Sequence, residues 1–218
     1  MSRRIIPILL CAVLAASALL PTGCSGMRYW SYVFLGDSGT KKVKAEFDKL
    51  ENKRVAVVVY LDQSVYYEHP RVDLQIAYAL RGQLTKNIDG LRVVDPRTVI
   101  AYQESDLDWA ALPKAELARK FNADYVLMVN VPEFSTSEPG TVRLFRGNVV
   151  ASPALYQAGV PEEKSCVWYE DAIRVTWPKE TQGKYGQSDA GVKKVTVALL
   201  ADRIAKFFYD HEENVEQE

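Results

Sequence analysis

The feature that most constrains the fold is an uninterrupted apolar run, rich in valine, that extends from Val55 to Tyr60. A short β-branched run of this kind predicts a strand that is buried on both faces. Apolar residues then recur every four positions, which predicts an amphipathic helix over residues 71–88. The positions of this stripe are Val72, Ile76, Leu80, Leu84 and Ile88. A buried strand followed by an amphipathic helix favours an α/β fold, in which helices cover a sheet.

The alternation of predicted strands and helices continues to residue 129. Residues 91–94 predict a second strand, and Asp95 before Pro96 predicts a helix that ends near residue 103, because an acceptor side chain followed by proline suits a helix N-terminus. Residues 114–121 predict a further helix, and the apolar residues 125–129 predict a third buried strand. The order up to this point is βαβαβ.

The second half of the chain does not continue this alternation of strands and helices. Residues 142–150 and 167–177 predict an antiparallel hairpin, since apolar residues alternate along both segments. We expect its loop to hold Pro153, Gly159 and Pro161, and a long helix to begin at Ser188 or Asp189. Residues 54–211 are therefore expected to form one three-layer α/β domain with a mixed sheet of about five strands in the order βαβαβββα. An acidic tail that frays, residues 212–218, follows it.

The amino terminus has the layout of a signal peptide, because Arg3 and Arg4 precede an apolar stretch over residues 5–20 that carries no charge. This stretch is shorter than the roughly twenty residues that a membrane-spanning helix needs. Leu20-Pro21-Thr22-Gly23-Cys24 follows and resembles the lipobox of bacterial lipoproteins, although Pro21 stands where leucine is usual. The resemblance implies that residues 1–23 are cut off and that the Cys24 thiol carries a diacylglyceryl group. An ordinary cleaved signal and an uncleaved anchor helix are the alternatives.

Two or three acyl chains at Cys24 would give an effectively permanent anchor, since each buried methylene contributes about 0.8 kcal/mol. Residues 24–53 are expected to form a lipidated tether with a short helix near residues 43–50. The aromatic residues at 29–34 suit either the lipid head groups or the core of the domain itself. Ser25 after the cysteine resembles the enterobacterial signal for sorting to the outer membrane, which implies a domain that faces the periplasm.

Cysteine usage and charge exclude several classes of function. Cys11 leaves with the signal and Cys24 becomes a thioether, so Cys166 is the one remaining thiol and an intrachain disulfide is impossible. We expect Cys166 to be buried in a strand, and a cysteine-based metal site is excluded. The formal charge of −1 becomes −3 without Arg3 and Arg4. A nucleic-acid partner is not expected, because such proteins normally carry a basic excess.

The domain itself resembles a group of envelope domains, on the segment Leu117-Ala-Arg-Lys-Phe-Asn-Ala-Asp-Tyr-Val-Leu127 and on the order of its elements. The group contains the TolB amino-terminal domain, the penicillin-binding-protein activator lipoproteins and the soluble part of the curli-secretion lipoprotein. The resemblance implies a non-enzymatic module, without catalytic residues or a cofactor, that binds protein partners or assembles with itself. A pore is not expected, because no pair of long hairpin segments of alternating polarity is present.

One motif suggests an enzyme instead. Phe34-Leu-Gly-Asp-Ser38-Gly-Thr40 resembles the nucleophile block of GDSL esterases, which implies a lipid-anchored ester hydrolase that uses Ser38. A serine nucleophile needs a base, and neither His69 nor His211 lies in the Asp-x-x-His block of that family. An Asp-Ser-Gly turn is the simpler interpretation.

The remaining polar candidates favour solvated surface. The carboxylate pairs Asp106 with Asp108 and Glu162 with Glu163 lack further metal ligands nearby, and Asp171 suggests a bulge, a strand end or an edge. Four cations would suit an anionic glycan or lipid head group: Arg143, Arg146, Lys179 and Lys184. A third functional option is a cell-wall glycan site in loops at residues 132–140 and 178–186. No phosphate-binding glycine loop follows the first strand.

Overall fold

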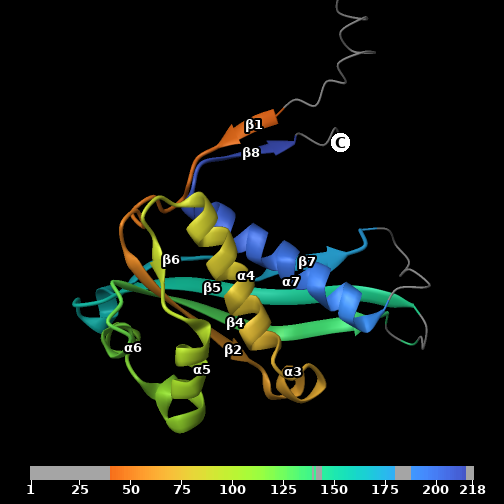
Figure 1. Ribbon diagram of the computed structural model, residues 1–218, viewed down its shortest axis with the longest axis horizontal. Helices are drawn as coiled ribbons and strands as arrows, with labels where there is room; N and C mark the ends of the chain where they lie inside the picture. The colour runs from red at the N-terminus through yellow and green to blue at the C-terminus, as the bar shows by residue number, and fades with distance from the viewer. Residues whose placement is uncertain (1–39, 139, 141–143, 180–187, 215–218) are drawn as a thin grey trace, which may run out of the picture. The chain divides into compact units, whose positions relative to one another are not determined.

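The computed structural model describes residues 40–138, 140, 144–179 and 188–214. The chain divides into two compact units, one of which runs from Val43 to His211. This larger unit is built on a six-stranded sheet in the order β3-β2-β4-β5-β6, with β7 also paired to β5 (Figure 1). Its strands are β2 (Arg54–Leu61), β3 (Arg92–Val93), β4 (Tyr125–Ser137), β5 (Phe145–Gln157), β6 (Cys166–Tyr169) and β7 (Ile173–Trp177). Its longer helices are α3 (Gln63–Glu68), α4 (Val72–Asn87), α5 (Pro96–Ser105), α6 (Lys114–Lys120) and α7 (Asp189–Ala205).

The parallel half of the sheet confirms the prediction from the valine run. Strand β2 is central and pairs in parallel with β3 on one side and β4 on the other. Val55, Val57 and Val59 are buried in the cluster that contains the apolar faces of α4 and α7. Ala56 and Val58 are buried in a second cluster with residues of α5 and α6. Helices therefore cover both faces of β2, and the unit has the three layers expected of a mixed α/β fold.

The helix boundaries agree with the predicted ones to within a few residues. The carboxylate of Asp95 accepts a hydrogen bond of 2.9 Å from Arg97 N and caps α5, with Pro96 at its first position. The hydroxyl of Ser188 accepts from Gly191 N at 3.1 Å and caps α7. In Figure 1, α4 and α7 lie side by side across one face of the sheet. Among the described residues, no helix combines the length and the apolar character that crossing a bilayer requires.

The antiparallel half confirms the predicted hairpin, because β5 pairs antiparallel with β6 and β7, but it corrects the predicted loop. Pro153 lies inside β5, opposite Val129, and not in a loop. Its carbonyl accepts from Glu170 N at 3.0 Å, and the nitrogen of a strand residue faces the same edge as its carbonyl. The missing N–H of Pro153 therefore faces the connection between β6 and β7, so no ladder bond to β4 is lost. Pro132 likewise lies in β4, at a shift in register between Asn130 and Glu133, where a bulge accommodates proline.

The predicted strand over residues 167–177 is two strands. Strands β6 and β7 pair with successive parts of β5, and residues 170–172 between them belong to neither. Asp171 is exposed in this break, which explains why a charged residue shares the parity of the apolar face. Cys166 begins β6 as predicted, but its side chain is exposed and not buried, because β6 lies at the border of the sheet.

The segment before β2 also differs from its prediction. Residues 44–53 contain no helix, and Leu50, which is 1% exposed, belongs to the larger core cluster. Backbone bonds join Glu46 N and Phe47 N to Phe207 O at 2.9 and 3.1 Å. The Glu46 carboxylate accepts from the indole N–H of Trp168 at 2.9 Å. The described part of the expected tether is therefore packed from Val43 onward.

The acidic end of the chain is not wholly frayed. Strand β8 (His211–Asn214) pairs with β1 (Thr40–Val43) in a two-stranded sheet. Backbone pairing orders these residues although their side chains are largely exposed.

Candidate functional site

A crevice of about 600 Å³ lies at the carboxyl end of β2. Helix α4 leads from β2 to β3 across one face of the sheet, and α5 and α6 lead from β3 to β4 across the other (Figure 1). The connections therefore step from β2 to β3 on one side and then back past β2 to β4 on the other. In open α/β sheets, ligands generally bind at the point where the strand order reverses in this way. We call this site the aromatic crevice. Its lining residues are Val59, Tyr60, Leu61, Gln63, Tyr66, Tyr67, Asp73, Ile100, Gln103, Glu104, Leu107 and Trp109.

Exposed aromatic and apolar side chains gather in this crevice. Tyr60, at the end of β2, is 46% exposed, and Tyr66 and Tyr67 on α3 are 53% and 72% exposed. Leu107 is 89% exposed. Among the described residues, the other large apolar side chains with comparable exposure are Tyr78, Tyr169 and Leu199. Such a concentration is characteristic of protein-binding surfaces, because tyrosine and tryptophan dominate their energetics.

Local structure fixes the aromatic rings in pairs. The Asp62 carboxylate accepts from Ser64 N at 3.0 Å and caps α3, which presents Tyr66 and Tyr67 together, with ring centroids 5.9 Å apart. Tyr60 meets Trp109 edge to face at 5.9 Å. Tyr66 and Tyr67 are both more than half exposed, so their rings remain accessible to a ligand.

The charged groups that line the crevice are the carboxylates of Asp73 and Glu104. Burial raises the pKa of Asp73 and outweighs the hydrogen bond of 2.7 Å from Leu74 N, which lowers it. The amide of Gln103 donates to Val59 O at 3.1 Å, while its buried Oε1 has no hydrogen-bond partner among the described residues. Glu104 forms an ion pair of 2.8 Å with Arg71, but both side chains are more than half exposed.

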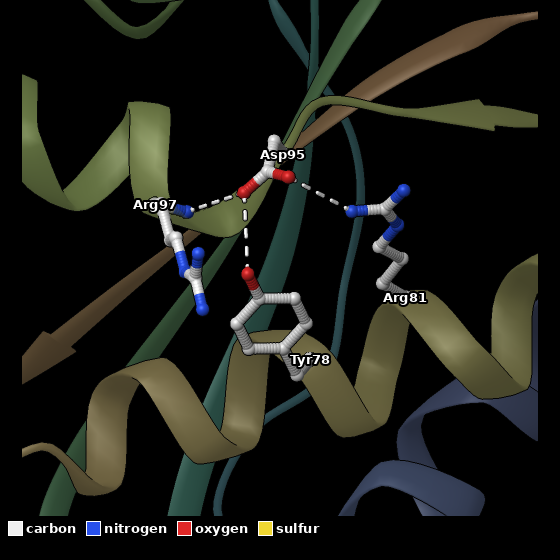
Figure 2. Close-up of polar contacts among 4 residues, drawn as sticks. All are labelled: Tyr78, Arg81, Asp95 and Arg97. Carbon is white, nitrogen blue, oxygen red and sulfur yellow. Dashed lines mark hydrogen bonds and ion pairs between the residues drawn. The ribbon is translucent and has the colours of Figure 1, made fainter.

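A carboxylate at the start of α5 has a different role. Figure 2 shows that Asp95 accepts hydrogen bonds from Arg97 N, from the Tyr78 hydroxyl at 3.3 Å and from Arg81 at 3.4 Å. The bond from Arg97 N is the main cause that lowers the pKa of Asp95. Tyr78 and Arg81 belong to α4 and Asp95 caps α5, so this cluster joins the two helices beside the crevice. Asp95 therefore caps α5 and connects it to α4, which is a structural role.

The carboxylate pairs, which were predicted to be solvated surface, contain exposed residues, and one member of each pair stabilises local structure. Asp106 accepts from the Tyr102 hydroxyl at 2.7 Å and from Asp108 N at 3.2 Å, which closes the turn after α5. Glu162 accepts from Lys114 N at 2.9 Å and from Ala115 N at 3.3 Å and so caps α6, whose own Pro113 has no capping side chain. No group of three or more potential metal ligands occurs in the described parts of the chain.

The other predicted sites divide between described and undescribed residues. Cys24, Ser38, Arg143 and Lys184 lie outside the described residues. Arg146 pairs with Glu138 at 3.4 Å, whereas Lys179 lines a separate cleft between β7 and α7. Residues 132–137, predicted as part of a glycan-binding loop, belong to β4.

The two histidines differ in their surroundings. His69 is 8% exposed, and its ring packs edge to face on Phe134 at 4.9 Å. Burial is the main cause that lowers the pKa of His69. His211 lies in β8, with Nδ1 3.2 Å from Tyr209 O.

The sequence analysis did not predict the aromatic crevice, because it placed no helix between the strand that ends at Tyr60 and the helix over residues 71–88, where α3 lies. The available signal was Tyr66-Tyr67, two adjacent aromatic residues outside the apolar stripe of the next helix.

No family model and no curated protein matches the chain. Among solved structures, the PelC dodecamer from Paraburkholderia phytofirmans is similar at 16% identity over 75% of this chain and 94% of that chain, with a TM-score of 0.44. Lipoprotein GNA1162 from Neisseria meningitidis is similar at 16% identity over 71% of this chain and 99% of that chain, also with a TM-score of 0.44. The minor lipoprotein from Acinetobacter baumannii is similar at 10% identity over 71% and 91%, with a TM-score of 0.30. At such identities and TM-scores the likeness carries no argument about activity, partners or location.

Proposed function

We propose that this chain is a non-enzymatic lipoprotein of the bacterial envelope, anchored by acyl chains on Cys24, whose α/β unit binds a protein partner or a further copy of itself. The observation that supports the binding role is the gathering of Tyr60, Tyr66, Tyr67 and Leu107 in the aromatic crevice. The anchor is supported by the signal-like residues 1–23 and the lipobox that ends at Cys24. The resemblance to the TolB and curli-secretion group agrees with both roles.

The binding role is tested by photo-crosslinking in whole cells. A photoreactive amino acid replaces Tyr67, which is 72% exposed in the crevice, and in a matched control it replaces Tyr169, which is 66% exposed on β6. We expect a defined crosslinked product from position 67 and none of that mass from position 169. Equal products from both positions, or none from either, would overturn the assignment of the crevice.

The anchor is tested by labelling cells with a fatty-acid analogue. Cys24→Ala is expected to abolish labelling, whereas Cys166→Ala, which removes the other thiol of the processed chain, should leave it unchanged. Membrane fractionation then tests the location. We propose the outer membrane with the domain facing the periplasm, so Ser25→Asp should move the protein to the inner membrane where the enterobacterial rule applies.

The absence of enzymatic activity is tested with a p-nitrophenyl ester. We expect no hydrolysis above the buffer rate from the natural protein. Hydrolysis that disappears in Ser38→Ala would establish the lipid-anchored esterase instead.

A further inference from the structure

We propose that the aromatic crevice selects a cationic segment of its partner, with a lysine or arginine side chain entering beside Asp73. This inference rests on the proposed binding role and specifies the chemistry of the bound segment.

The charged side chains of the lining favour a cationic ligand. Two charged side chains line the crevice, Asp73 and Glu104, and both are carboxylates. Glu104 pairs with Arg71 at the exposed rim, where such pairs are weak. Asp73 has no ion pair within 4.0 Å in the described parts of the chain. Arg71 also acts electrostatically on Asp73. One cation therefore faces two carboxylates, and the crevice keeps a net negative charge.

The Asp73 carboxylate can accept further hydrogen bonds. Its carboxylate is partly buried on the first turn of α4 and accepts from the adjacent Leu74 N. An ionised carboxylate accepts several hydrogen bonds, whereas lysine and arginine side chains are donors without acceptors. A cationic side chain would supply both the missing donors and the missing charge. An apolar segment would bury the same carboxylate further without adding a donor to it, which disfavours binding.

The aromatic rings of the crevice also favour a cation. Tyr60 with Trp109 and Tyr66 with Tyr67 line the same crevice as Asp73. The faces of tyrosine and tryptophan rings attract ammonium and guanidinium groups, and they repel anions for the same electrostatic reason. Rings and carboxylate therefore favour the same class of ligand.

The test measures binding of three blocked, dye-labelled octapeptides to the full acylated chain in neutral detergent by fluorescence anisotropy. The peptides share a Gly-Ser background and carry two lysines, two glutamines or two glutamates at the same positions. We expect the lysine peptide to bind at least tenfold more tightly than the glutamine peptide, the glutamate peptide not to bind, and the affinity to fall with added salt. A neutral N-acetylglucosamine tetramer is the fourth probe and should not compete.

Variants locate the binding. Asp73→Asn keeps the shape of the side chain and should weaken the lysine peptide about tenfold, which corresponds to about 1.4 kcal/mol. Asp171→Asn removes the same charge from the exposed break between β6 and β7 and should leave binding unchanged. Tyr67→Ser should also weaken binding, while Tyr169→Ser should not. Circular dichroism of each variant verifies that it is folded.

The inference is overturned if lysine and glutamine peptides bind equally, if Asp73→Asn binds like the natural chain, or if the lysine peptide fails to bind at about 1 mM. Competition by the sugar tetramer would also overturn it, in favour of a glycan ligand. The proposed binding role and this inference can fail separately. A product crosslinked at position 67 in cells, without any preference for lysine peptides, would support a partner in the crevice but exclude its cationic character.

Discussion

Leu50→Ala tests whether the segment before β2 stabilises the larger unit. Leu50 is 1% exposed in the core cluster, and the substitution removes the equivalent of three carbon atoms. At about 0.8 kcal/mol per buried methylene, the transfer loss is about 2.4 kcal/mol. The remaining cavity brings the expected loss to about 2–5 kcal/mol. Since the whole unfolding free energy of a domain is about 5–15 kcal/mol, this is a large fraction of it.

The assay is urea unfolding of the full chain, followed by tryptophan fluorescence. Trp168 reports on this region directly, because its indole N–H donates to Glu46 in the same segment. We expect a lower urea midpoint with an unchanged slope. Leu107→Ala is the matched control, because Leu107 is 89% exposed and should change the free energy of unfolding by less than about 0.5 kcal/mol. A loss for Leu50→Ala as small as that of the control would refute the packing of residues 43–53.

Three further predictions concern stability. Gly147→Ala should cost about 1–3 kcal/mol in urea unfolding, because its Cβ would overlap a threonine side chain of α7; Gly82→Ala, where a Cβ meets nothing within 4 Å, should stabilise α4 by up to about 1 kcal/mol. Glu162→Ala should lower the free energy of unfolding by about 0.5–2 kcal/mol through loss of the α6 cap, whereas an equal loss for Glu163→Ala would contradict this role. Because burial lowers the pKa of His69, the unfolded chain takes up that proton more readily, so stability should fall as the pH drops below about 6.5. Urea midpoints at several pH values should show this fall in the natural chain and a weaker one in His69→Phe.

The parallel half of the fold could be predicted because each of its elements carries a local pattern. Val55, Val57 and Val59 alternate with Ala56 and Val58, and both sets are buried against different helices. A run that is apolar at every position has no polar face, so it can only lie between two layers. The four-residue recurrence in α4 then supplies one of these layers.

The antiparallel half resisted prediction because its prolines depend on tertiary structure. Pro153 normally argues against a strand, since proline donates no ladder bond. It is tolerated in β5 because its nitrogen faces the connection between β6 and β7, where no ladder bond is needed. The local sequence around Pro153 contains no signal for this change of partner strand. The same break places Asp171 in solvent, so one tertiary feature explains both departures.

The crevice could not be predicted because its residues come from β2, α3, α4, α5 and the turn that follows α5. Tyr66 and Tyr67 are exposed and therefore leave no periodic pattern, which only burial imposes. The anchor at Cys24 could be proposed from the sequence alone, because the motif that resembles a lipobox is contiguous. Contiguous chemistry is visible in a single chain, whereas an assembled surface requires the fold.

The contrast between Asp95 and Asp73 connects stability with the proposed role. Asp95 accepts from Arg97 N, Tyr78 and Arg81, so the folded protein favours its ionised form, and the pKa of this group is lowered. Burial raises the pKa of Asp73, so at neutral pH folding works against the charge that this group carries. Perturbed groups of this kind gather at functional sites, and the position of Asp73 among exposed tyrosine rings agrees with the proposed cation. A cationic side chain beside Asp73 would stabilise its ionised form and so counteract the effect of burial on its pKa. This stabilisation would contribute to the affinity for the partner.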